Sequence, residues 1–94
     1  LPGRALHAHW VQVIDAQWQR FRRRVEAGEP TLVDPYGTAG TEEFFAVASE
    51  AFFVAPLEFA AEEPVLHELL QRFYGQDPAA DHRAIVKAED PPPR

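Results

Sequence analysis

Hydrophobic residues recur at helical spacing along the first quarter of the sequence. They are separated by steps of three and four between residues 5 and 27, which places them on one face of an α-helix. Gly28 and Pro30 end this pattern, because glycine favours a helix C-terminus and proline cannot continue a helix. The pattern therefore predicts a helix over residues 5–27. Its apolar face consists of Leu6, Trp10, Val13, Ile14, Phe21 and Val25, with Trp18 beside it.

The segment over residues 29–41 has the composition of a loop. Residues 31–33 form a short extended piece, and residues 34–37, Asp-Pro-Tyr-Gly, have the composition of a turn. Aspartate favours the first position of a turn, proline fits the second, and glycine closes it. Thr41 is a suitable N-cap for the element that follows.

Residues 42–54 are apolar on nearly all sides. Their length and alanines favour a helix, although phenylalanine and valine would tolerate a strand. A helix that is hydrophobic all round is typical of a buried position. Phe44, Phe45, Phe52 and Phe53 span much of its circumference, so we expect that this chain alone does not bury all four.

The rest of the chain predicts two further helical pieces and a tail. Residues 56–63 suggest a short helical turn or a linker, and residues 64–74 have an apolar helical face that begins at a proline and ends before Gly75. The sequence thus predicts a mainly α fold with three main helices. We expect residues 1–79 to form one helical unit and residues 80–94 to form a weakly structured, proline-rich tail.

Composition and charge narrow the function. The 94 residues include no cysteine, which excludes disulfides and thiolate metal ligands. The net charge of −6 argues against general nucleic-acid binding, and no apolar run is long enough to cross a membrane. Arg20 and Arg22–Arg24 suit the C-terminal end of the first helix. They fit a solvated helix end or, alternatively, a patch for phosphate or a partner.

Two glutamates of the second predicted helix are candidates for chemistry. Glu43 and Glu50 are seven residues apart and therefore project from nearly the same helix face. A buried carboxylate needs a partner, so they could pair with an arginine of the first helix, hold a metal or act in catalysis, or simply face water. Tyr36 lies on the turn seven residues before Glu43, from where a phenol can donate a hydrogen bond to a developing oxyanion. A tyrosine in a loop is more often a packing residue.

The stretch over residues 34–53, DPYGTAGTEEFFAVASEAFF, resembles the hallmark of the zinc-dependent peptidases of the Mlc titration factor A family. The similarity extends over roughly residues 4–79. It implies a cytoplasmic gluzincin with aminopeptidase activity on peptides, which also binds the transcriptional repressor Mlc. Carried onto this sequence, Glu43 matches the third zinc ligand and Tyr36 matches the residue that stabilises the transition state. Glu50 lies in the same motif, and we expect it to orient a ligand histidine.

The sequence departs from this family by containing no H-E-x-x-H motif, which would provide two zinc-binding histidines and a catalytic glutamate. In residues 67–71, His-Glu-Leu-Leu-Gln, glutamine replaces the second histidine. His7 and His9 point to different helix faces, and His82 lies in the predicted tail. The chain also lacks methionine, which indicates a processed chain or a fragment. In the family the H-E-x-x-H motif lies upstream of the matching residues, so the resemblance implies the C-terminal part of such a peptidase, inactive without that helix. The alternative is a non-catalytic helical module that binds a transcriptional regulator.

Overall fold

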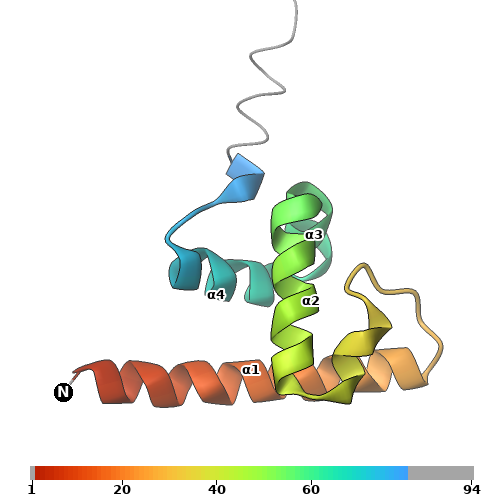
Figure 1. Ribbon diagram of the computed structural model, residues 1–94, viewed down its shortest axis with the longest axis horizontal. Helices are drawn as coiled ribbons and strands as arrows, with labels where there is room; N and C mark the ends of the chain where they lie inside the picture. The colour runs from red at the N-terminus through yellow and green to blue at the C-terminus, as the bar shows by residue number, and fades with distance from the viewer. Residues whose placement is uncertain (1, 81–94) are drawn as a thin grey trace, which may run out of the picture.

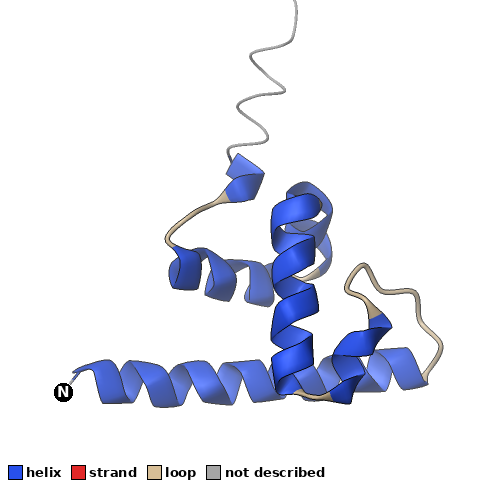
Figure 2. Cartoon of the chain, in the orientation of Figure 1, coloured by secondary structure: helices blue, strands red, loops and turns tan. Residues whose placement is uncertain are grey.

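The computed structural model describes the backbone of residues 2–80 and the side chains of residues 9–80, and this part of the chain consists of helices joined by loops and turns (Figure 2). It contains α1 (Pro2–Glu26), the 3₁₀-helix η1 (Pro35–Ala39), α2 (Thr41–Val54), α3 (Pro56–Glu62) and α4 (Pro64–Tyr74). A further helical turn begins at residue 78. No strand occurs within residues 2–80, where a bend at residues 32–33 replaces the extended piece predicted over residues 31–33. The predicted mainly α fold is therefore confirmed. The predicted tail lies, from residue 81 onward, outside the described residues.

Helix α1 is the longest element. Helix α2 runs roughly perpendicular to it, with the first turn of α2 at α1 (Figure 1). Ile14 and Phe21 of the predicted apolar face are buried, at 6% and 2% exposure. Trp10, Trp18 and Val25 pack against the same core. The helix ends close to the predicted position, because Gly28 adopts a positive φ of 76° that other residues rarely adopt.

Only one side of α2 is covered within the described part of the chain. Phe44 and Phe52 are fully buried there, whereas Phe45 is half-buried and Phe53 is 43% exposed. This agrees with the expectation that the chain does not bury all four rings. The side that faces inward packs against Phe21, Phe59, Leu66 and Leu70.

Helices α3 and α4 follow α2 with almost no connecting residues. Each begins with a proline, Pro56 or Pro64, as expected for the first helical position. The short turn predicted over residues 56–63 is thus a regular helix. A hydrogen bond of 2.8 Å from the hydroxyl of Tyr74 to Ser49 Oγ joins α4 to α2. None of the helices within residues 2–80 is long and apolar enough to cross a lipid bilayer.

The arginines near the end of α1 correct one interpretation of the sequence. Two of them do not form a solvated helix end: Arg20 and Arg24 both bind Glu63, with N···O distances of 2.9 and 2.8 Å. The Glu63 side chain is only 2% exposed. Burial of this carboxylate requires cationic partners, and two arginines one turn apart on α1 provide them.

The start of α2 corrects a second prediction. Gly40, not Thr41, is the N-cap, and Thr41 is the first helical residue. Gly40 has an extended backbone and makes no side-chain cap. The carboxylate of Glu43 instead lies above it, as described below.

Candidate functional site

The turn that carries Tyr36 is held by hydrogen bonds of its own. The Asp34 carboxylate accepts a hydrogen bond of 2.9 Å from the Tyr36 backbone N–H, and the Asp34 carbonyl accepts one of 2.9 Å from Gly37. Pro35 occupies the first position of η1, where its fixed φ suits the turn. The Tyr36 side chain is 63% exposed. The sequence therefore places an exposed phenol on a well-bonded backbone.

Gly37 fastens η1 to the two large helices. A Cβ atom at Gly37 would lie 2.9 Å from Val47 Cγ2 and 3.2 Å from Phe44 Cα, so only glycine fits against α2 without movement. From α1, Trp18 Nε1 donates a hydrogen bond of 2.9 Å to the Gly37 carbonyl. Gly37 is itself buried.

Glu43 lies in the first turn of α2 and is half-buried. Its carboxylate lies above Gly40, where a Cβ atom would come within 2.5 Å of Glu43 Oε2. A negative charge is favourable at a helix N-terminus. Within residues 9–80, neither Glu43 nor Glu50 forms an ion pair or a side-chain hydrogen bond. The pairing with an arginine of α1 that the sequence left open is not formed there. Arg20 and Arg24 bind Glu63 instead, and Arg22 pairs with Glu26 of its own helix.

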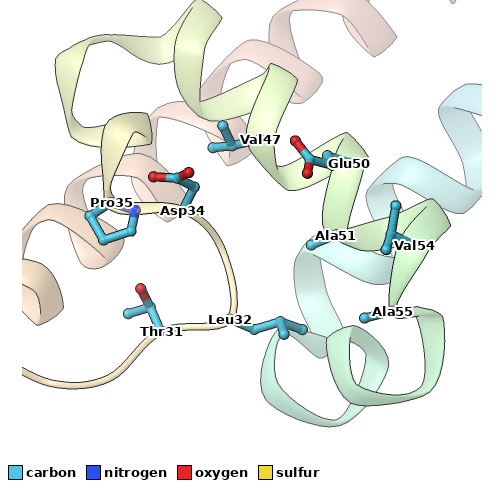
Figure 3. Close-up of a pocket in the computed structure, with 9 residues that line it drawn as sticks. All are labelled: Thr31, Leu32, Asp34, Pro35, Val47, Glu50, Ala51, Val54 and Ala55. Carbon is cyan, nitrogen blue, oxygen red and sulfur yellow. The ribbon is translucent and has the colours of Figure 1, made fainter.

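Glu50 lies two turns beyond Glu43 on the same face of α2 and is exposed. We refer to Glu43, Val47, Glu50 and Val54 as the outer face of α2. A cleft of about 360 Å³ separates part of this face from the loop that leads into η1, and Figure 3 shows these two walls. Its lining consists of Thr31, Leu32, Asp34, Pro35, Val47, Glu50, Ala51, Val54 and Ala55.

Glu43 fits one position of a metal site. Its carboxylate has no protein partner among the described residues, and carboxylate oxygen is a normal ligand of zinc. The described residues include no group of three or more histidine, aspartate or glutamate side chains that could hold a metal ion. His67 lies among the aromatic rings of the core, and its ring centroid is 5.5 Å from that of Phe52. Its Nε2 atom lies 3.4 Å from Asp77 Oδ1. His9 is exposed on α1, and the side chains of His7 and His82 lie outside the described residues.

Two residues that matter to this arrangement were not singled out by the sequence. Trp18 was assigned only a place beside the apolar stripe, yet its N–H anchors the turn. A partly buried tryptophan usually finds a hydrogen-bond acceptor, and that preference was the available signal. Glu63 was missed as well, although Arg20 and Arg24 are spaced one helical turn apart and so can share one anion.

The chain is similar in sequence to a family of known proteins. The family described as glucose-regulated metallo-peptidase M90 matches residues 1–75. Mlc titration factor A of Klebsiella pneumoniae is 45% identical over 78 residues, which cover 81% of this chain and 29% of that protein. Its counterpart in Serratia proteamaculans is 35% identical over 75 residues, with 78% and 29% covered. An uncharacterized protein of Synechocystis is 31% identical over 72 residues, with 77% and 26% covered.

The match covers only part of the length of these relatives. No solved structure matches the chain at a significant level. The chain spans a little more than a quarter of the length of these curated relatives. The match to the M90 description nevertheless extends from the first residue through the end of α4, and it includes Tyr36, Glu43 and Glu50. The chain therefore belongs to the glucose-regulated metallo-peptidase M90 family.

Proposed function

We propose that this chain contributes two residues to the active site of a zinc-dependent peptidase, Glu43 as a zinc ligand and Tyr36 as a hydrogen-bond donor. One observation carries the proposal: Glu43 is a half-buried carboxylate without a protein partner among residues 9–80, in a chain of a metallo-peptidase family. The other ligands would come from an H-E-x-x-H motif outside this sequence. The 94 residues alone would then be inactive.

Each residue would have a distinct task in such a site. Zinc supplies Lewis acidity, which polarises a peptide carbonyl and activates water for hydrolysis. Tyr36 would donate its phenolic hydrogen bond to the carbonyl oxygen as that oxygen gains negative charge. Glu50, on the same outer face of α2, would accept the second N–H of a ligand histidine and so fix its orientation.

Further parts of this proposal rest on the family resemblance. They are aminopeptidase-type hydrolysis of peptides, a cytoplasmic location and binding of an Mlc-type transcriptional repressor. The alternative function is a non-catalytic helical module that binds a transcriptional regulator. The names of the Klebsiella and Serratia relatives and the exposed Phe53 and Val54 at the end of α2 favour it. The two functions are compatible in one protein.

The test compares Glu43→Gln with Tyr36→Phe in the full-length protein that carries this segment. Glu43→Gln removes a charged ligand, so zinc content and peptidase activity should fall together. Tyr36→Phe removes only a hydrogen-bond donor and should leave zinc bound while kcat falls ~10²–10³-fold. Glu50→Gln should weaken zinc affinity ~10–100-fold. Zinc content is measured by elemental analysis and activity with a panel of peptides.

Glu42→Gln is the matched control, because Glu42 lies beside Glu43 in the first turn of α2 but is exposed. It removes the same charge from the helix N-terminus and should retain zinc and activity. Full zinc content and activity in Glu43→Gln would show that the carboxylate serves only the stability of α2.

A further inference from the structure

Tyr36 combines an exposed side chain with a fixed backbone. The residue is 63% exposed, and its hydroxyl makes no hydrogen bond within the part of the chain that the structure describes. The backbone of η1 therefore sets the point from which the phenol projects. Whatever fixes η1 against the helices also fixes this attachment point of the proposed oxyanion donor.

Contacts from three sides fix that backbone. Asp34 bonds the N–H groups of Tyr36 and Gly37, but it belongs to the same turn and cannot anchor the turn to the rest of the molecule. Helix α2 contributes van der Waals contact, with Val47 and the Phe44 backbone close against Gly37. These contacts limit how near η1 can approach α2. Because van der Waals contacts are not directional, they do not fix the orientation of η1.

Trp18 supplies the directional contact. Its Nε1–H donates to the Gly37 carbonyl at 2.9 Å, and this is the hydrogen bond that joins α1 to η1 among the described residues. The indole is itself held in place, because the Arg22 guanidinium lies 4.8 Å from the centroid of the Trp18 ring. The acceptor belongs to the residue directly after Tyr36, so a shift of this carbonyl moves the phenol.

We propose that Trp18 is a positioning residue, which orients Tyr36 through its hydrogen bond to the Gly37 carbonyl. The inference rests on the proposed role of Tyr36 as an oxyanion donor. It assigns to α1 a part in the chemistry that neither the sequence pattern nor the family match gives it.

Trp18→Phe tests this in the full-length protein, because phenylalanine keeps an aromatic ring and removes the N–H donor. We expect kcat to fall about 10–100-fold, as for a small misplacement of a catalytic group, with KM and zinc content unchanged. In a Tyr36→Phe background, Trp18→Phe should cause no further loss of kcat, since the group that it positions is gone. In metal-free protein, hydrogen exchange of the amides of residues 36–40 should become faster.

Trp10→Phe is the matched control. Trp10 lies on the same helix, and its buried Nε1 has no hydrogen-bond partner among the described residues. This variant should leave kcat and the exchange of residues 36–40 unchanged. Should Trp18→Phe unfold the protein, benzothienylalanine at position 18 in the Trp10→Phe background removes the N–H while keeping the shape of the indole.

The outcomes separate the two proposals. Unchanged kcat in Trp18→Phe, with kcat lowered in Tyr36→Phe, would overturn the positioning role alone. An equal fall of kcat in the presence and absence of the Tyr36 hydroxyl would also overturn it, because Trp18 would then act on something other than Tyr36. Unchanged kcat in Tyr36→Phe would refute the proposed role of Tyr36 as a hydrogen-bond donor, on which the positioning role rests.

Discussion

Gly40 lies directly beneath the carboxylate of Glu43. A Cβ atom there would be 2.5 Å from Glu43 Oε2 and 3.6 Å from Glu43 Cδ, and within 4 Å it would meet no other atom. The backbone of Gly40 is extended, with φ 174° and ψ 171°, which alanine also adopts. One methyl group at this position would therefore displace the carboxylate and leave the rest of the fold in place.

We accordingly expect Gly40→Ala to separate metal binding from stability. The free energy of unfolding of the metal-free protein should change by less than about 0.5 kcal/mol. Zinc affinity should fall by about tenfold or more, because the ligand oxygen must move. Competition titration with a zinc chelator and urea denaturation measure the two quantities. An unchanged zinc affinity would contradict the role of Glu43.

The sequence could predict the candidate residues but not how they are held. The spacing of Tyr36, Glu43 and Glu50, and the hallmark around them, were visible in the residues themselves. The position of the Glu43 carboxylate was not, because it depends on a side-chain conformation and on the extended backbone of Gly40. The same cause explains why Thr41 was wrongly predicted as the N-cap.

At the scale of elements, Glu63 and its neighbour Glu62 together join three parts of the chain. It begins the turn from α3 to α4 and binds Arg20 and Arg24 of α1. The neighbouring Glu62 accepts a hydrogen bond of 2.8 Å from the Leu32 backbone N–H, in the loop before η1. Helix α1, that loop and the start of α4 are thus connected through charged side chains at one place.

Glu63→Ala should destabilise the protein by about 2–4 kcal/mol, because it leaves two arginines without their shared anion. The lower part of this range applies because Arg20 is 45% exposed. Glu68→Ala is the control: its ion pair with Arg72 has side chains 63% and 77% exposed. Such a pair contributes about 0–1 kcal/mol. Chemical denaturation of both variants measures the difference, and equal effects would refute the structural role of Glu63.

Helix ends were easier to predict than helix contacts. Gly28, Pro56, Pro64 and Gly75 act on their own neighbours, so the boundaries of the helices could be read locally. The contact of Arg20 with Glu63 spans 43 residues, and no local pattern specifies such a partner. The apolar sequence of α2 indicated burial on all sides, but the structure covers only one side within the described residues.

The whole molecule exposes apolar side chains where α2 ends. Phe53 is 43% exposed and Val54 is 75% exposed, on a chain that spans little more than a quarter of its relatives. Apolar side chains that lie together on a surface favour association with other apolar surfaces.

We expect the isolated 94-residue chain to bind a hydrophobic dye or to self-associate. Val54→Lys should weaken both effects because it places a charge within the exposed patch. Gln12→Lys, at an exposed position on α1, is the control and should leave them unchanged. Dye fluorescence and light scattering provide the measurements. A monomer without dye binding would contradict the expectation.

The two tryptophans of the sequence, both on α1, differ in the environment of their indole protons. The Trp18 proton is bonded to a carbonyl, whereas Trp10 packs against the rings of Phe45 and Phe73 with its N–H unbonded among the described residues. In a nitrogen-15 spectrum they would give two separate indole resonances, assignable with one substitution. The first resonance follows the turn that carries Tyr36, and the second follows the contact of α1 with α2 and α4. The molecule thus contains two native spectroscopic probes, one for the attachment of η1 to α1 and one for the packing of α1 against α2 and α4.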